Sequence, residues 1–277
     1  MRGRFPLISC LTAVVLGLGA GVWPSIRAEA FHRPDPKKMA SATASAFADK
    51  KWPAPTPGTW TVPPASADGL PPVISRIATQ EKVVFLTIDD GYEYDAEFVG
   101  IVRREQVPIL TFLTTSYLPK HGPYFWAMKH AGSPIENHTV SHPNMVTLSA
   151  EGQQKEICDA SASIEKAYGR RPTIFRAPFG SSNDVTRQAA KACGIKSLLF
   201  WTAEFYNGTK SPRGTPDDFQ RGDGATGFKP GDIVLMHYRK GLAGQFTTLL
   251  GWIRAAGFTP AAIENYLPVS LGGNAPG

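Results

Sequence analysis

Residues that could bind a metal ion or transfer protons lie at separate points of this 277-residue sequence. Asp89 and Asp90 are adjacent and precede a glycine, and His138 and His142 are separated by three residues. Two imidazoles at that spacing lie on one side of a helical turn or of a tight loop. With one carboxylate they would form a three-ligand metal site that keeps positions open for water and substrate, as hydrolytic metal centres do. The other aspartate would remain free to act as a base.

Two more residues extend this candidate site. Arg176, in the sequence FRAPFG, could hold a neighbouring carboxylate ionised and oriented. His237 follows the apolar residues VLM and could act as a general acid. Taken alone, each feature also has an ordinary structural interpretation: a turn for the Asp-Asp-Gly sequence, a surface ion pair for the arginine and a core histidine for His237.

The elements that would position these residues alternate between strands and helices. Runs of apolar and β-branched residues predict strands at 82–88, 108–113, 134–136, 172–175, 196–200 and 232–236, and helical patterns include 97–104, 149–168 and 183–193. This alternation predicts a parallel α/β sheet, either open or closed as a barrel. The candidate residues stand at the carboxyl ends of the predicted strands, and Trp201 ends the fifth strand. In a parallel sheet those ends meet at one face, where active sites are built.

The composition excludes several classes of protein. With 42% hydrophobic and 19% charged residues the chain can bury a full core, which rules out a disordered or fibrous protein. The net charge of +6 is mild, and the sequence contains no run of lysine and arginine and no aromatic-basic stripe. Nucleic-acid binding is therefore not expected, whereas contact with a polyanionic wall or surface is consistent with the charge.

The first 30 residues have the pattern of a secretory signal peptide. Arg2 and Arg4 precede an apolar run over 7–23, and Ala-Glu-Ala at 28–30 is typical of a cleavage site. An uncleaved membrane anchor is the alternative, because the run approaches the roughly 18 residues that a transmembrane helix needs. The protein is therefore expected to be secreted or associated with a cell wall, or else anchored on the outer face of the plasma membrane.

The rest of the chain divides into a linker, a domain and a tail. Residues 31–79 hold nine of the 24 prolines, which predicts a semi-extended linker. The alternative is a wrap of this segment over the domain through Trp52 and Trp60. The domain is expected over 80–268, followed by a flexible tail over 269–277.

Cys158 and Cys193 lie at similar depth in two consecutive predicted helices. In the oxidising compartment that a signal peptide implies, they either form a disulfide or stay as two buried thiols. A nucleophilic role is not expected, because both lie away from the strand ends.

Four ordered motifs resemble those of the polysaccharide deacetylase family, the NodB-homology domains also called carbohydrate esterase family 4. Residues 87–91 resemble T-F-D-D-G with Ile88 in place of Phe, 138–142 resemble H-[ST]-x-x-H followed by Pro143, 176–180 resemble R-x-P-[YF]-G, and 235–237 resemble L-x-H. The match covers roughly residues 80 to 267. It implies a distorted (β/α) barrel with fewer than eight full units.

The resemblance also implies roles for individual residues. Asp90, His138 and His142 would bind one divalent metal ion, with zinc expected and cobalt or nickel as alternatives. The catalytic set would be Asp89 as the base, Arg176 holding it ionised, and His237 as the acid. The expected substrate contacts are Tyr92, Pro178, Phe179, Trp201 and Leu235. For the aromatic side chains, and also for Phe205, Tyr206 and Tyr238, core packing is the more ordinary role.

One motif departs from the family pattern. The family usually carries D-x-x-D-W after the fifth strand, whereas WTAEFYNG at 201–208 places Glu204, Asn207 and Gly208 at the nearest equivalents. Glu204 and Asn207 are therefore candidates for tuning His237, and the groove wall that the family tryptophan supplies is missing.

The predicted function is removal of acetyl groups from a glycan by a secreted, metal-dependent hydrolase. The substrate would be N-acetylated, such as peptidoglycan or a chitin-like oligosaccharide, or O-acetylated, such as acetylxylan. Membrane contact is expected only if the N-terminal segment stays uncleaved. A second interpretation is a catalytically impaired carbohydrate-binding or regulatory protein on the same fold. A third, a metal phosphatase or nuclease, lacks the second set of metal ligands that such enzymes use.

Overall fold

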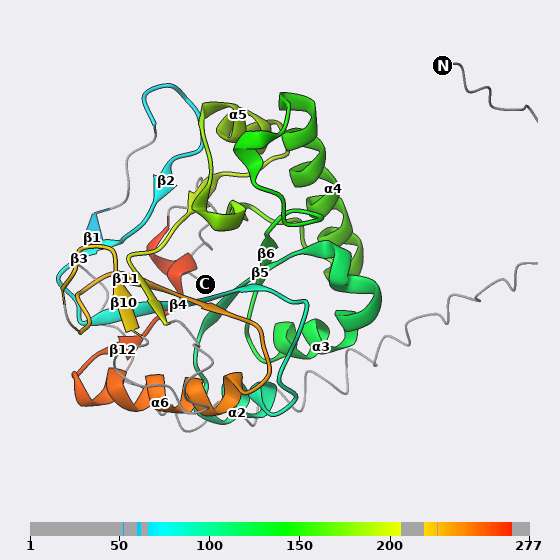
Figure 1. Ribbon diagram of the computed structural model, residues 1–277. Coiled ribbons are helices and arrows are strands. Elements are labelled where there is room, and N and C mark those ends of the chain that lie inside the picture. Colours follow the sequence, from blue (N-terminus) through cyan, green and yellow to red (C-terminus); the bar gives the residue numbers. More distant parts are fainter. Residues whose placement is uncertain (1–51, 53–59, 62–65, 206–218, 226, 268–277) are drawn as a thin grey trace, which may run out of the picture. The chain divides into compact units, whose positions relative to one another are not determined.

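A computed structural model describes residues 52, 60–61, 66–205, 219–225 and 227–267. The main sheet has the strand order β10-β9-β11-β4-β5-β6-β7-β8-β2, and β12 pairs with β4 beside this path (Figure 1). The strands are β1 Trp60–Thr61, β2 Val73–Ile74, β3 Ala78–Thr79, β4 Val83–Asp90, β5 Ile109–Leu113, β6 Ile135–Asn137, β7 Ile174–Phe175, β8 Ser197–Leu199, β9 Ala203–Phe205, β10 Phe219–Arg221, β11 Asp232–His237 and β12 Thr259–Pro260. The helices are α2 Phe98–Glu105, α3 Leu118–His130, α4 Ala150–Tyr168, α5 Asp184–Ala192 and α6 Leu242–Ala255, with short 3₁₀ turns η1 Thr115–Tyr117, η2 Met145–Thr147, η3 Pro178–Gly180 and η5 Ile263–Tyr266.

Neighbouring strands of this sheet run parallel, except that β10 is antiparallel to β9. Among the described residues the path ends at β10 on one side and at β2 on the other, so the barrel is open. The predicted fold class, a distorted parallel barrel of the polysaccharide deacetylase type, is confirmed.

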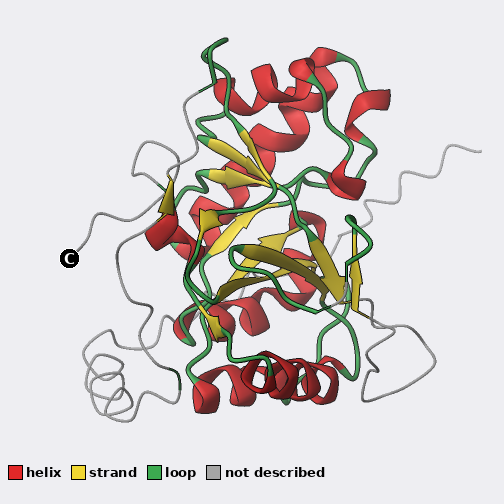
Figure 2. Ribbon diagram, turned by 90° about the vertical axis from the view of Figure 1, so that its left-hand side faces the viewer, coloured by secondary structure: helices red, strands yellow, loops and turns green. Residues whose placement is uncertain are grey.

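The central strand β4 is buried on both faces. Seven of its eight residues are buried, as expected for a parallel strand with packing on each side. Val84, Leu86 and Ile88 face the cluster that α2 and α6 complete, whereas Val83 and Phe85 face a second cluster that includes residues of η5. This alternation follows from the two-residue period of a strand. Figure 1 shows α2 and α6 side by side, and Figure 2 shows helices on opposite sides of the strands.

The domain begins earlier than the predicted residue 80. Within the segment assigned to the linker, β2 joins the main sheet through β8, and β3 pairs with β1. Arg76 forms an ion pair with the buried Asp232 at 2.5 Å. Trp52 is also packed against the core, 7% exposed and 4.1 Å from the Arg254 guanidinium, as the wrapping alternative requires for this residue.

Several predictions on domain organisation fall outside the described residues. The signal peptide over 1–30, most of the linker, and the tail over 269–277 are among them. Within the part of the chain that is described, no helix combines the length and the apolar character that crossing a membrane requires.

Cys158 and Cys193 form a disulfide bond, which decides between the two predicted alternatives. Cys158 lies in the middle of α4, and Cys193 is the residue that follows the last turn of α5. The bond therefore ties two helices that also pack against each other.

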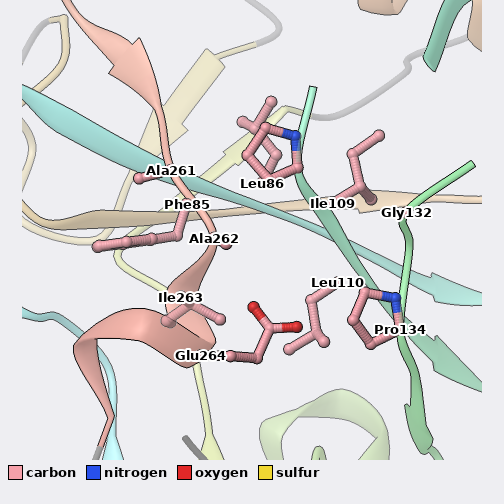
Figure 3. A pocket seen from close by; sticks show the side chains of 11 residues that line it. Phe85, Leu86, Ile109, Leu110, Gly132, Pro134, Ala261, Ala262, Ile263 and Glu264 are labelled. Carbon is pink, nitrogen blue, oxygen red and sulfur yellow. The ribbon is translucent and has the colours of Figure 1, made fainter. Parts of the chain in front are cut away.

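A cavity of about 150 Å³ lies at the amino ends of β5 and β6, at the sheet edge opposite to the one that carries the candidate residues. Its walls are mostly apolar, and Glu264 of η5 points its carboxyl group into it (Figure 3). Burial raises the pKa of Glu264 to about 7; the nearby charge of Glu136 adds to this, whereas the backbone N–H of Glu264 itself and Arg170 act in the opposite direction.

We expect Glu264 to make the protein less stable as the pH rises from about 4.5 to about 7. Over that range the unfolded chain has lost the proton and the folded protein still holds it, so folding must bind a proton. The free energy of unfolding should fall by roughly 3 kcal/mol across the window and then stay level. Glu264→Gln should remove this slope and be the more stable protein at about pH 8. Urea unfolding at several pH values measures the free energy of unfolding, and Glu165→Gln, at an exposed position, is the control. If the free energies of wild type and Glu264→Gln changed in parallel with pH, the prediction would be wrong.

Candidate active site

Five side chains from the strand ends meet at the carboxyl edge of the sheet. The parallel register of β11 and β4 places His237 beside Asp89. His138 Nε2 lies 3.6 Å from Asp90 Oδ1 and 3.7 Å from Asp89 Oδ2, and His142 Nε2 lies 3.2 Å from the same Asp90 oxygen. Residues that are far apart in the sequence therefore form one cluster.

The cluster has the features of a metal site. The ligand atoms of Asp90, His138 and His142 all lie within 4.8 Å of one another. Asp90 Oδ1 is buried and has no hydrogen-bond partner among the described residues, although it faces both imidazoles. His138 Nδ1 donates to the carbonyl oxygen of Arg176 at 2.8 Å, so Nε2 faces Asp90 and is the nitrogen that a metal ion would bind. One carboxylate and two imidazoles in this arrangement fit a divalent ion such as zinc, cobalt or nickel.

The backbone at the end of β4 lets both aspartates lie near His138. Asp90 adopts a left-handed conformation with φ of 80°, and Gly91 follows with φ of 112°. A Cβ atom on Gly91 would lie 2.6 Å from Leu113 Cδ1 and 2.8 Å from Phe125 Cζ, so only glycine fits there. Burial by itself would raise the pKa of Asp90, but the two histidines outweigh it and hold that pKa well below its usual range.

Asp89 is paired with a fully buried arginine. Arg176 Nη1 donates to Asp89 Oδ1 at 2.7 Å and to Thr87 Oγ1 at 2.8 Å. The other guanidinium nitrogens donate to the carbonyl oxygens of Leu199 and Phe200 at 2.9 and 3.1 Å. The arginine is thus an internal support rather than a surface ion pair, and Asp89 keeps its second oxygen toward the metal-site cluster.

His237 ends β11, and Glu204 of β9 is a charged neighbour of it. The distance from His237 Nδ1 to Glu204 Oε1 is 3.9 Å, and this nitrogen has no hydrogen-bond partner among the described residues. Of the two predicted tuning residues, the structure therefore brings Glu204 to the histidine, whereas Asn207 lies outside the described residues. A carboxylate at this distance places a negative charge beside the ring without a direct hydrogen bond to it.

We expect Glu204→Gln to lower kcat roughly tenfold, because the amide removes the negative charge that lies 3.9 Å from the proposed general acid His237. Metal binding should not change, since Glu204 is not among the three ligand residues. Steady-state acetate release together with metal analysis of the purified variant measures both quantities. An unchanged kcat would show that Glu204 does not act on the histidine.

The predicted substrate contacts divide into exposed and buried residues. Tyr92 is 47% exposed and Phe179 is 69% exposed, with the Phe179 ring 4.8 Å from that of His142. Trp201 is half-buried beside Gly180, while Pro178 and Leu235 are buried. Phe205 and Tyr238 are fully buried in the core, and Tyr206 lies outside the described residues. The rings of Tyr92 and Phe179 are accessible from solvent, and substrate contact by any of the five residues stays a prediction.

Tyr117 of η1 is a site residue that the sequence did not reveal. Its ring lies 6.1 Å from that of Tyr92, and burial together with the negative charge of Asp90 raises the pKa of its hydroxyl. The turn follows β5, the one predicted strand whose carboxyl end carried no candidate residue. That gap in the pattern was the only available signal for Tyr117.

Comparison with known proteins identifies the family of this chain. The family model described as polysaccharide deacetylase matches residues 76–198. An uncharacterized protein of Streptomyces coelicolor is 35% identical over 203 residues, which cover 72% of this chain and 78% of that protein. The chain belongs to the polysaccharide deacetylase family. A further relative in this family is the peptidoglycan-N-acetylmuramic acid deacetylase PdaA of Bacillus subtilis, 26% identical over 46% of this chain; the match spans about half of PdaA, 49%.

Among solved structures, the polysaccharide deacetylase fold recurs in a mutant of a carbohydrate esterase family 4 pseudoenzyme from Bacillus anthracis, in which enzymatic activity was restored. It is 25% identical to this chain, has a TM-score of 0.61, and covers 74% of this chain and 75% of its own. Carbohydrate esterase family 4 therefore includes a pseudoenzyme of which a mutant has restored activity.

Proposed function

We propose that this protein is a secreted, metal-dependent polysaccharide deacetylase that hydrolyses acetyl groups from N-acetylated sugars of a cell-wall or extracellular glycan. One observation carries the proposal: a buried Asp89–Arg176 ion pair lies next to the Asp90, His138 and His142 cluster. A metal site with a purely structural role would not need a further aspartate that stays off the metal and is held by an arginine. The name of the relative PdaA supports peptidoglycan as the first substrate to test.

The residues of the chain divide the chemistry among them. Asp90, His138 and His142 would hold the metal ion. When bound, the ion supplies a polarised acetyl carbonyl and a more acidic water. Asp89, oriented by Arg176, takes the proton from the attacking water, and it suits this role because it is not one of the ligands. His237 then donates a proton to the departing sugar amine, so that the products are acetate and a deacetylated sugar.

Exposed rings around the cluster would bind the sugar. Tyr92 and Phe179 are among the exposed large hydrophobic residues of the described chain; Phe179 packs against His142, and Tyr92 follows Asp90 by two positions. An aromatic face can cover the apolar C–H surface of a pyranose ring. This placement supports a carbohydrate substrate over a small acetylated metabolite.

Secretion is part of the proposal. The apolar N-terminal run with its small-residue cleavage sequence supports it, and so does the Cys158–Cys193 disulfide, because disulfides persist in oxidising compartments.

A second candidate function is glycan binding or regulation without turnover. The similarity to a pseudoenzyme favours it, and so does the replacement of the D-x-x-D-W motif, because Glu204 at 3.9 Å is too far from His237 Nδ1 to form a hydrogen bond. The intact Asp89, Arg176 and His237 argue for activity.

Acetate release by the purified protein tests the two candidates. N-acetylglucosamine oligomers, peptidoglycan and acetylxylan serve as substrates, with metal-stripped protein compared with zinc- and cobalt-restored protein. Release that requires metal supports the deacetylase and ranks its substrates. Folded protein that binds metal but releases no acetate from any of them would favour the binding function instead.

A further inference from the structure

The loop that carries both histidine ligands has an unusual backbone. Thr139 and His142 both adopt left-handed conformations, with φ of 71° and 61°. Residues other than glycine rarely do so, and the conformation is least favourable for a β-branched residue such as threonine. Such a backbone persists only where surrounding contacts impose it. The contacts that impose it therefore decide where His142 points.

One carboxylate on α4 makes three of these contacts. Glu156 Oε2 accepts the backbone N–H groups of Val140 and Ser141, each at 2.9 Å. Its Oε1 accepts the hydroxyl of Ser141 at 2.7 Å. Hydrogen bonds to an ionised carboxylate are roughly twice as strong as neutral ones. Glu156 thus binds Val140 and Ser141, the two residues that lie between the left-handed positions.

The helix that presents Glu156 is itself held in place. Asn137, at the end of β6, donates to the carbonyl oxygen of Ile157 and to Ser161 Oγ, both at 2.8 Å. Two residues after Glu156, the disulfide at Cys158 joins α4 to the end of α5. The carboxylate therefore acts from a fixed position relative to the strand end that precedes the loop.

The two histidines differ in how much they need this support. His138 directly follows β6, and its Nδ1 is fixed by the carbonyl oxygen of Arg176. His142 lies beyond the left-handed turn, where its backbone N–H donates to Thr139 Oγ1 at 2.9 Å. Without Glu156 the turn would still be held by the Thr139 N–H bond to Asn137 Oδ1 and by the N–H groups of Thr115 and Ser116, but the N–H groups of Val140 and Ser141 would lose their acceptor. We therefore expect the turn to loosen and His142 to shift, while His138 would keep its own supports.

We propose that Glu156 is a positioning residue for the metal site: it sets the conformation of residues 139–142 and so holds His142 toward Asp90 without touching the metal. This inference rests on the proposed metal-dependent function. Supporting groups of this kind typically change metal affinity by 10- to 100-fold when they are removed. We expect Glu156→Ala to weaken binding of Co²⁺ by about that factor and Glu156→Gln by less, because an amide oxygen can still accept the loop N–H groups.

Calorimetric titration of the metal-stripped full chain with Co²⁺ measures the dissociation constants. Glu165→Ala, at an exposed position of the same helix, is the control and should bind like wild type. The deciding measurement is a cycle with His142→Ala. If Glu156 acts through His142, Glu156→Ala should cause no further loss of affinity in the His142→Ala background.

Equal affinity of Glu156→Ala and wild type would overturn the inference. So would an equal loss in both backgrounds, because Glu156 would then act on the whole fold rather than on His142. If Glu156→Ala does not fold, Glu156→Gln gives the same comparison. A wild-type chain that binds no Co²⁺ at all would remove the proposed metal site, and this inference with it, which is a different result from normal binding in every variant.

Discussion

Replacing Asp89 by asparagine should lower the rate of acetate release by roughly 10²- to 10⁴-fold, the range for loss of a general base. The amide has the same shape and can still accept the hydrogen bond from Arg176, but it cannot take a proton from water. Because Asp89 is not among the three ligand residues, the metal content should stay at the wild-type level. Acetate assays and metal analysis on the same preparation measure both quantities.

Asp159→Asn is a suitable control, because this aspartate forms an exposed ion pair with Lys155 on the surface of α4. It should release acetate at the wild-type rate. Thermal unfolding of Asp89→Asn should confirm that the variant is folded at the assay temperature. A near-normal rate for folded Asp89→Asn would remove Asp89 from the role of base.

The second large effect is expected on stability. Arg176→Met should lower the free energy of unfolding by about 3–5 kcal/mol, the cost of leaving one charge of a buried ion pair without its partner. Asp89 is 3% exposed, so water cannot replace the lost guanidinium. The carbonyl oxygens of Leu199 and Phe200 also lose their donor.

A double variant separates the ion pair from the rest of this loss. In Asp89→Asn/Arg176→Met neither charge remains buried, so its destabilisation should be smaller than the sum of the two single effects. Urea unfolding of the four proteins at constant pH gives the difference. Additive effects would mean that the pair contributes no coupling and that Arg176 acts only through packing and its bonds to carbonyl groups.

The parallel sheet could be predicted because its strands are short apolar runs that end in polar residues. The strands expected at 82–88, 108–113 and 232–236 appear as β4, β5 and β11 with small shifts at their ends. Their carboxyl ends lie together because parallel strands leave the topology little choice. The main features of the candidate site followed from this constraint, once the strand directions were set.

The features that were missed depend on tertiary contacts. Helix α3 contains Pro123 and Gly122, which are poor helix formers, and its place in the fold comes from burial of Phe125 and Met128. The two-residue strand β2 is too short for a periodic pattern, and only its pairing with β8 defines it. In the sequence, Glu156 is one of several charged residues on a predicted helix. Only the folded conformation of residues 139–142 shows which groups its carboxylate binds.

The Cys158–Cys193 bond has a consequence for the unfolded chain as well as for the folded one. The two cysteines are 35 positions apart, and the segment between them contains β7 and η3 with Arg176 and Phe179. In the chain-entropy description, a cross-link that closes a loop of this length removes roughly 4 kcal/mol of conformational freedom from the unfolded state. A typical domain is stabilised by only about 5–15 kcal/mol in total. A reduced chain would have to bury the Asp89–Arg176 pair without the contribution of the disulfide. Burial of the arginine that orients the proposed base is thus linked to the oxidation state of two cysteines outside the site.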